Sequence, residues 1–200
     1  MKFLGLDRVL CLSPHPDDVE YGMSGTVWKH PETAFTVFTM SVGSRGDEGS
    51  DIVRQQEVTS FWGDSVTVRL RAGHFYEKEE TGVCQVETDG YDAILVPPER
   101  DSHFEHAMTN RIGRALTRDR PIALIEYCTV STHLDWTPNL MVDIGREFER
   151  KRGALHEAFT SQEDRAYFRG PVLDTFHRNM QAGKKGILYV ERFRLVEVYR

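Results

Sequence analysis

The sequence has little cysteine and no long apolar run. Its 3 cysteines stand far apart, and none of them forms a CxxC pair. A disulfide framework or a thiolate zinc site is therefore not expected. No apolar stretch is long enough to span a bilayer, and the residues before Asp7 are too few for the apolar region of a signal peptide. We expect a soluble, cytoplasmic protein without a transmembrane segment.

Positive charge is also scarce. The chain has 25 Lys and Arg against 31 Asp and Glu, which gives a formal net charge of -6. A protein that binds nucleic acid through its phosphates needs a basic surface, so no nucleic-acid partner is expected. Repeats of fixed period and low-complexity tracts are absent as well. With 200 residues, 40% of them hydrophobic, residues 1–200 suit one domain with an ordinary core.

Predicted strands alternate with predicted helices along most of the chain. This order is typical of an α/β fold, with a mostly parallel sheet and helices on both faces. The segment 43–49 is predicted to be a glycine-rich loop, and the segment 73–90 shows no clear pattern. Strands are predicted at about 8–13, 34–42, 66–70, 93–96, 122–129 and 187–198, the last as a strand or hairpin edge, and helices at about 20–30, 51–62, 103–118 and 142–158.

The turn after the first predicted strand lacks the glycines of a dinucleotide-binding motif. A GxGxxG loop places glycines directly after the strand so that backbone N–H groups can reach a phosphate. Here the turn holds His15, Asp17 and Asp18, whereas Gly22 and Gly25 come too late. Dinucleotide binding is therefore disfavoured, and the small residues of the following helix are expected to let it pack close to the sheet.

Two clusters of polar residues each follow a short apolar strand. Residues 14–18 (PHPDD) end the first strand, and residues 101–106 (DSHFEH) follow the strand at 93–96. Imidazole and carboxylate groups attract a divalent cation, and three protein ligands leave room for water and substrate, as in catalytic zinc sites. His15, Asp18 and His106 are the candidate ligands.

Two further residues of these clusters suit acid–base chemistry. Asp17 is placed to take a proton from a water held by the metal. His103 precedes His106 by one helical turn and could donate a proton or stabilise an oxyanion. The structural alternative is that each cluster is a turn with a helix cap, as most single His-Pro or Asp-Asp pairs are. Two such clusters, each after a buried strand, make that alternative much weaker.

These motifs resemble those of the LmbE-like (PIG-L) de-N-acetylases, which are zinc hydrolases of N-acetylglucosaminyl conjugates. The HPDD motif at 15–18 and Gly25 match the family signature, and residues 101–106 match its Asp-x-His-Pro-Asp-His segment. Phe104 and Glu105 stand where the family has proline and aspartate. Arg54 and Glu57 match the family's Arg-x-x-Glu helix. Weaker matches run through 126–127, 151–162 and 191–193, while the segment 70–91 follows no family pattern.

The resemblance implies a Rossmann-like fold and de-N-acetylation of an N-acetylglucosamine-type sugar conjugate. By this resemblance, zinc is held by His15, Asp18 and His106. Asp17 is the general base and His103 its acidic or electrostatic partner. Two residues are expected to bind substrate, each with a structural alternative: Arg54 against an exposed pair with Glu57, and Asp101 against a helix N-cap.

Two other functions stay open at this point. One is a sugar- or nucleotide-binding module that kept the fold without catalysis, although the complete set of candidate residues speaks against it. The other is a metal hydrolase acting on a phosphoester, but such enzymes commonly use two metals and no ligands for a second one are apparent. The sugar, its aglycone, the acyl group and a homo-oligomeric state are not specified by the sequence.

Overall fold

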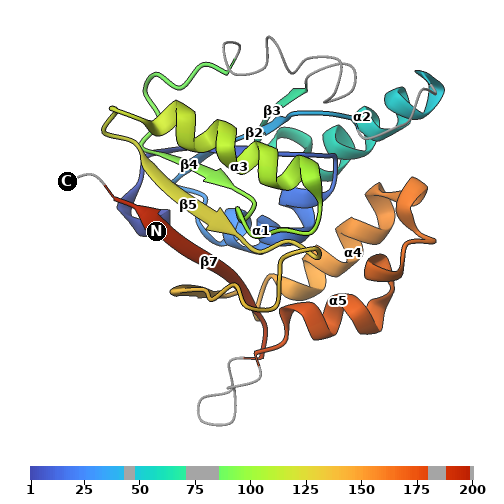
Figure 1. Ribbon diagram of the computed structural model, residues 1–200. Coiled ribbons are helices and arrows are strands. Elements are labelled where there is room, and N and C mark those ends of the chain that lie inside the picture. Colours follow the sequence, from blue (N-terminus) through green and yellow to red (C-terminus); the bar gives the residue numbers. More distant parts are fainter. Residues whose placement is uncertain (43–47, 71–85, 180–187, 199–200) are drawn as a thin grey trace.

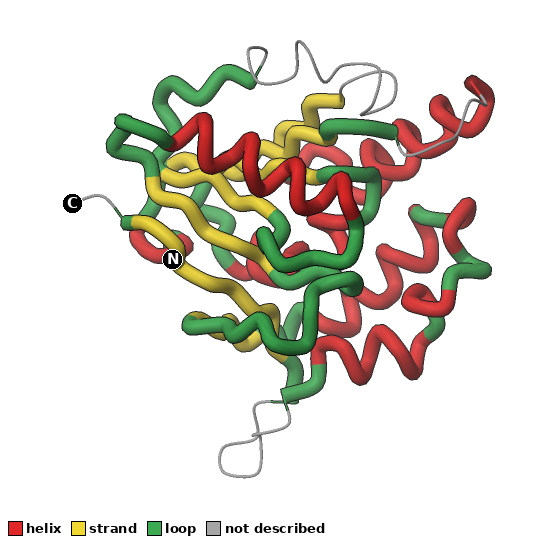
Figure 2. Tube along the Cα trace, viewed as in Figure 1, coloured by secondary structure: helices red, strands yellow, loops and turns green. Residues whose placement is uncertain are grey.

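The computed structural model describes residues 1–42, 48–70, 86–179 and 188–198. These residues form a seven-stranded sheet with the order β3-β2-β1-β4-β5-β7-β6 (Figures 1 and 2). The strands are β1 (Arg8–Ser13), β2 (Ala34–Thr39), β3 (Thr67–Leu70), β4 (Ala93–Val96), β5 (Ala123–Tyr127), β6 (Leu140–Asp143) and β7 (Val190–Glu197). The α-helices are α1 (Asp18–Lys29), α2 (Glu48–Trp62), α3 (Phe104–Thr117), α4 (Phe148–Ala158) and α5 (Gly170–His177).

The sheet is mostly parallel. Strands β3, β2, β1, β4 and β5 run in one direction, and β7 is antiparallel to both β5 and β6. A parallel sheet has to be covered on both faces, so its central strands are apolar at successive positions. In β4 all the residues are buried, and in β1 only Arg8 is exposed. The predicted α/β class is confirmed.

Two layers of helices cover the sheet. Because successive side chains of a strand point to opposite faces, Val9 and Cys11 pack in one cluster with residues of α1, α2 and α4. Leu10 and Leu12 pack in a second cluster on the face covered by α3. As expected, α1 lies close to its neighbours: a Cβ added to Gly22 would lie 2.8 Å from the carbonyl oxygen of Cys128.

The C-terminal part differs from the prediction. Residues 142–158 do not form one helix, because Leu140–Asp143 is strand β6 and α4 begins at Phe148. Between them the Asp143 carboxylate accepts a hydrogen bond from the Gly145 N–H at 2.9 Å, which turns the chain. Strand β7 lies inside the sheet between β5 and β6, so the alternative of a hairpin edge is wrong. Helix α5 was not predicted, although Pro171 in its first turn is a helix-start signal.

The other predicted helices and strands agree with the observed ones within a few residues at each end. Some predicted segments lie outside the described residues. The bounds of β1 and β4 match the predicted ones. Helix α2 begins at Glu48, so the end of the predicted loop 43–49 is helical; residues 43–47 and 71–85 are not described. No helix among the described residues has both the length and the apolar character needed to cross a bilayer.

The chain reverses its direction of progress across the sheet between β1 and β4. From β1 it proceeds outward through β2 and β3, and it then returns to β4 on the other side of β1. In open α/β sheets the crevice at such a point, outside the carboxyl ends of the two strands, is where ligands bind. Both polar clusters follow these two strands, so the fold brings them to the same crevice.

Candidate metal and catalytic site

The turn after β1 is held in an unusual backbone conformation. Asp17 has φ 109°, in the region that favours glycine, and a non-glycine residue there costs about 1–3 kcal/mol. Hydrogen bonds hold it: the Asp17 N–H donates to Glu20 Oε2 at 3.0 Å, and the Tyr21 N–H donates to the Asp17 carbonyl oxygen at 2.7 Å. Strain of this kind persists where the surrounding structure imposes it, and it is concentrated at functional sites.

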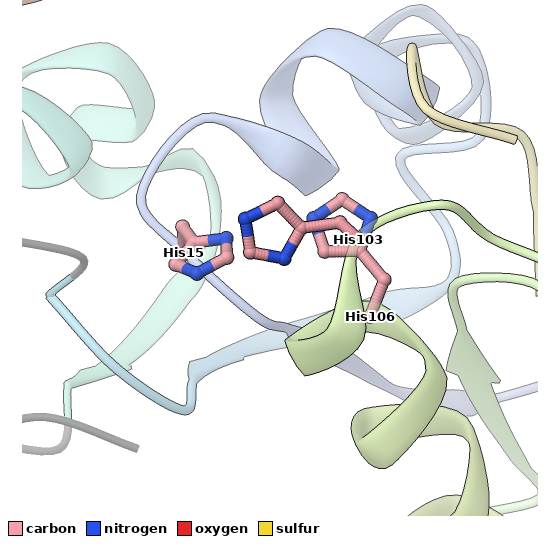
Figure 3. Close-up of side chains that lie close together, drawn as sticks. All are labelled: His15, His103 and His106. Atoms are coloured by element: carbon pink, nitrogen blue, oxygen red, sulfur yellow. The ribbon is translucent and has the colours of Figure 1, made fainter. Parts of the chain in front are cut away.

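The second cluster is fixed by the start of α3. The His103 N–H donates to Asp101 Oδ1 at 2.8 Å, just before the helix begins at Phe104. The first turn of α3 then places His106 beside His103, with ring centroids 4.7 Å apart. His15 meets both rings from the β1 side, so the three histidines gather from two distant segments (Figure 3).

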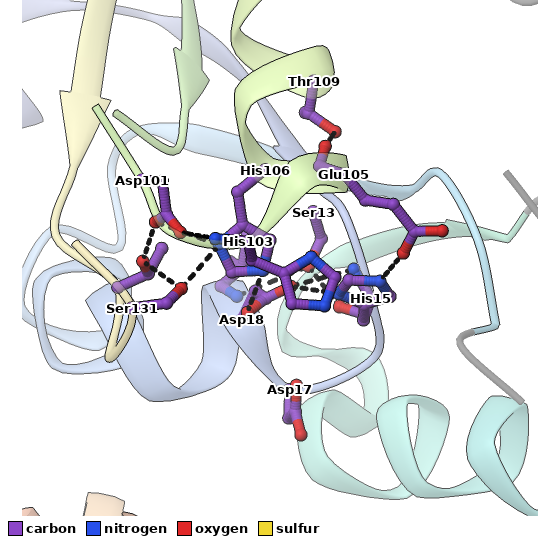
Figure 4. Close-up of polar contacts among 12 residues, drawn as sticks. Ser13, His15, Asp17, Asp18, Asp101, His103, Glu105, His106, Thr109 and Ser131 are labelled. Carbon is purple, nitrogen blue, oxygen red and sulfur yellow. Dashed lines mark hydrogen bonds and ion pairs between the residues drawn. The ribbon is translucent and has the colours of Figure 1, made fainter. Parts of the chain in front are cut away.

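Asp18 lies between two of these imidazoles. Its Oδ2 is 3.1 Å from His15 Nδ1, and its Oδ1 is 3.3 Å from His106 Nε2 (Figure 4). Ligands of one tetrahedral zinc ion, each about 2.0–2.1 Å from the metal, lie about 3.3 Å from one another. Both nitrogen–oxygen distances are close to that spacing, which suits ligands of one ion.

A second carboxylate holds the far nitrogen of each imidazole. His106 Nδ1 lies 3.1 Å from Asp101 Oδ2, and His15 Nε2 is hydrogen-bonded to Glu105. Metal-binding histidines usually have such a partner, which fixes the tautomer and the ring orientation. Glu105, which stands where the family has aspartate, thus contacts His15.

A different donor set includes His103. One ring nitrogen from each of His15, His103 and His106 lies within 4.8 Å of the others. Asp18 also lies close to two of these histidines, 3.1 Å from a ring nitrogen of His15 and 3.3 Å from one of His106. The structure therefore brings four candidate donors together, and His103 is one of the residues that line the pocket.

The buried charges of the cluster shift one another's pKa. Burial lowers the pKa of His15, but hydrogen bonds to Asp18 and Glu105 outweigh it and raise the value to about 9. Burial also opposes the positive charge of His106, and Asp18 and Asp101 raise its pKa to about 10. Burial disfavours the Asp18 carboxylate, yet the two histidines lower its pKa well below the usual range. Each imidazole is thus paired with carboxylates of opposite charge.

Asp17 has the environment of a general base. Burial raises its pKa to about 6, against the opposing charge of Arg54. The Arg54 guanidinium donates to Asp17 Oδ2 at 3.3 Å, and the Tyr167 hydroxyl is 3.4 Å from the same oxygen. A carboxylate with a pKa closer to neutrality is better matched to proton transfer near pH 7.

The two expected substrate-binding residues are placed differently. Arg54 is only 8% exposed and pairs with Glu57 at 3.3 Å, but it still lines the pocket next to Asp17. Asp101 has no exposed side-chain surface: its Oδ2 also accepts from the Thr129 hydroxyl at 2.5 Å. The Asp101 carboxylate therefore lies behind His106 and does not face the pocket.

These residues surround a cavity of about 300 Å³. One wall comes from the segment 160–168, which sequence reasoning missed apart from the weak match at 161–162. Glu57 holds this segment by accepting from the Ser161 N–H at 2.7 Å, and the Tyr21 hydroxyl donates to the Tyr167 carbonyl at 2.9 Å. Besides the predicted residues His15, Asp17, Asp18, Arg54, His103 and His106, the cavity is lined by Tyr21, Thr129, Val130, Ser131, Gln162, Arg165 and Tyr167.

Comparison with solved structures shows which proteins share this fold. N,N'-diacetylchitobiose deacetylase from Pyrococcus horikoshii is 23% identical, with a TM-score of 0.72 over 97% of this chain and 85% of its own. Teicoplanin deacetylase, solved in a zinc-inhibited form, is 12% identical, with a TM-score of 0.70 over 93% and 96%. The 4-carboxy-2-hydroxymuconate hydratase from Pseudomonas putida is 15% identical, with a TM-score of 0.69 over 97% and 98%.

Sequence comparison adds no closer relative, since no family model and no curated protein matches the chain. The chain has the fold of the LmbE-like (PIG-L) deacetylases, as the motifs at 15–18 and 101–106 predicted. Because a hydratase shares that fold, the reaction has to be argued from the site.

Proposed function

We propose that the chain is a zinc-dependent N-deacetylase that hydrolyses the acyl amide of an N-acetylated sugar conjugate within a single domain, 1–200. One observation carries the proposal. The Asp18 carboxylate faces an imidazole nitrogen of both His15 and His106, and a further carboxylate holds the other nitrogen of each ring. These contacts support an open metal site, and Asp17, the proposed base, lines the same pocket.

Zinc held by His15, Asp18 and His106 would polarise the acyl carbonyl and acidify the attacking water. The Asp17 carboxylate takes the proton as the water oxygen bonds to the carbonyl carbon. His103, on the pocket surface, hydrogen-bonds to the oxyanion. Asp17 then returns the proton to the amide nitrogen as the C–N bond breaks, so that water and the amide give acetate and a free amine.

Arg54 and Asp101 support these groups. The Arg54 guanidinium next to Asp17 favours the ionised base and fixes its direction, because it also donates to the Pro16 carbonyl. Its place in the pocket wall lets it contact substrate hydroxyls as well. Asp101 acts through His106, as a positioning residue, since its carboxylate is covered on the pocket side.

The test is release of primary amine by the zinc-loaded protein from a panel of N-acetylglucosamine conjugates. We expect about one zinc per chain by elemental analysis and measurable amine release. Asp17→Asn should keep the zinc and lose on the order of 10²–10⁴ in rate, because the base is missing while the ligands remain. Unchanged activity in Asp17→Asn would remove it from the mechanism, and two zinc ions per chain would favour the phosphoester hydrolase.

The ligand set is tested separately. His106→Ala and Asp18→Ala should each lower the zinc content, whereas His103→Ala should lower the rate and retain the metal. The reverse result for Asp18 and His103 would establish the three-histidine set instead. Zinc content is measured after dialysis against a weak chelator, so that loosely bound ions are not counted.

A further inference from the structure

A second, open cavity adjoins the catalytic pocket. It has a volume of about 530 Å³ and lies over the chain between β5 and β6. Val130 and Ser131 line both cavities, so the two adjoin each other at these residues. A substrate whose acyl amide is at the metal site can therefore extend into this groove, which we call the 130–135 groove.

The chain that forms the groove is firmly held. The His133 N–H donates to the Arg100 carbonyl at 3.1 Å, and the Ser102 N–H donates to the Ser131 carbonyl at 3.0 Å. Trp136 anchors the far end, where its buried indole donates to Glu126 Oε2 at 2.8 Å. The first two bonds tie the segment to the chain before α3, beside which it passes in Figure 1, and the third ties it to β5. Its exposed side chains are thus presented on a fixed backbone.

Two of those exposed side chains are apolar. Leu134 is 105% exposed and Val130 is 40% exposed, and both line the groove. A single exposed leucine is ordinary on a protein surface. What sets these two apart is that they lie on a hydrogen-bonded loop in a groove next to the catalytic pocket, where a bound group would cover them.

The two opposite charges that line the groove, Arg100 and Asp135, pair with each other. The Arg100 guanidinium pairs with the Asp135 carboxylate at 2.7 Å, and Ser102 Oγ donates to the Ser131 carbonyl. An anionic or cationic group would have to compete with this pair. An uncharged apolar group loses nothing to it and gains contact with Leu134 and Val130.

We propose that the 130–135 groove binds the aglycone of the substrate and that this aglycone is an uncharged alkyl or aryl group. The proposal rests on the proposed deacetylase function. Leu134 is then a specificity-determining residue: it contacts the part of the substrate that does not react. Binding energy from this part is expected to raise kcat/KM.

The test compares the hexyl and methyl β-glycosides of N-acetylglucosamine. The wild type should prefer the hexyl glycoside by about tenfold in kcat/KM, as expected when a few methylene groups leave water. Leu134→Ser should bring that ratio down to about one or two by lowering kcat/KM for the hexyl glycoside. The matched control is Leu188→Ser, which changes a leucine that is 44% exposed and lines neither cavity. It should keep the preference.

Equal use of both glycosides by the wild type, or a hexyl preference that survives in Leu134→Ser, overturns the groove proposal. Amine release from neither glycoside counts against the deacetylase function on this substrate class. In that case equilibrium dialysis of the two glycosides with zinc-loaded Asp17→Asn decides the groove by itself. Tighter binding of the hexyl glycoside that Leu134→Ser abolishes supports it, and equal or undetectable binding of both overturns it.

Discussion

Two groups of buried charges in this protein are built for opposite purposes. Beneath α1, Lys151 and Glu191 form an ion pair at 2.5 Å with no exposed side-chain surface. Glu191 also accepts from the Gly25 and Thr26 N–H groups, so its carboxylate is fully used. At the ends of β1 and β4 the charged side chains are largely buried too, but they keep some exposed surface and converge beside a cavity. We call the Lys151–Glu191 group the closed network and the group at the ends of β1 and β4 the open network. The closed network stabilises the fold, whereas the open network leaves room for a ligand.

The largest effect is expected from breaking the closed network. Lys151→Met removes the cation and leaves the Glu191 carboxylate buried without its charge partner, which should lower the free energy of unfolding by about 3–5 kcal/mol. Chemical denaturation of the metal-free protein measures it. The zinc content of the remaining folded protein should not change, because Lys151 contacts none of the candidate ligands. Lys29→Met is the control: it removes a half-buried cation that donates to the Asp143 carbonyl, leaves no buried carboxylate without its charge partner, and should lower the free energy of unfolding by much less.

Asp101→Asn tests the open network at its edge. The amide keeps the shape of the side chain but loses the negative charge that supports His106, and the affinity for zinc should fall by about 10–100-fold. Competition with a chromogenic chelator measures the affinity. Asp135→Asn is the control. It changes an exposed carboxylate that pairs with Arg100 and contacts neither His15 nor His106, so this variant should bind zinc as the wild type does. Unchanged affinity in Asp101→Asn would remove its positioning role.

The sequence predicted the two parts of the open network that are local in the chain, the clusters at 14–18 and 101–106. Strands β1 and β4 were predicted with their observed bounds, because each is a short apolar run that a proline ends. Five of the seven predicted site residues line the cavity for that reason, and Arg54 of α2, expected from the family resemblance, lines it as well. Asp101 does not, because a local pattern cannot tell a carboxylate that faces the pocket from one that lies behind a histidine.

The remaining wall depends on contacts between distant residues. Gln162, Arg165 and Tyr167 reach the cavity because Glu57 binds Ser161, 104 positions away. No spacing within the segment 160–168 indicates this. Strand β6 was missed for a similar reason: its four residues become a strand by pairing with β7, and the alternation of half-buried and exposed residues is too short to read alone.

Acid should lower the free energy of unfolding through His177, which is buried near Lys151 of the closed network. Burial, and then the nearby Lys151 charge, lower the pKa of His177 well below its usual value, so the folded protein holds it neutral. Below pH of about 6.5 the unfolded chain binds a proton here that the folded chain does not, and stability falls as the pH falls. This one group should contribute a slope of about 1.4 kcal/mol per pH unit below that pH.

Replacement of His177 tests that slope. Unfolding free energies of wild type and His177→Phe, measured by denaturant titration from pH 7 to pH 5, should differ in their pH dependence by up to one proton. The absolute stability of the variant is not the readout, because two carbonyl contacts of the imidazole are lost with it. Parallel pH profiles for the two proteins would show that His177 does not titrate on unfolding.

The smallest effect on stability is expected at Asp17, in the strained turn after β1. This residue belongs to the open network, but its replacement is expected to change the stability of the fold. Asp17→Gly and Asp17→Asn both remove the base, and only glycine relieves the backbone at φ 109°. Relief of about 1–3 kcal/mol, less the 0.4–1 kcal/mol that glycine adds to the freedom of the unfolded chain, leaves Asp17→Gly about 1 kcal/mol more stable than Asp17→Asn. Denaturant titration of the two metal-free variants measures the difference. An Asp17→Asn variant as stable as Asp17→Gly would mean that the turn stores no strain. The expected result would mean that this position keeps an aspartate for catalysis at the expense of stability.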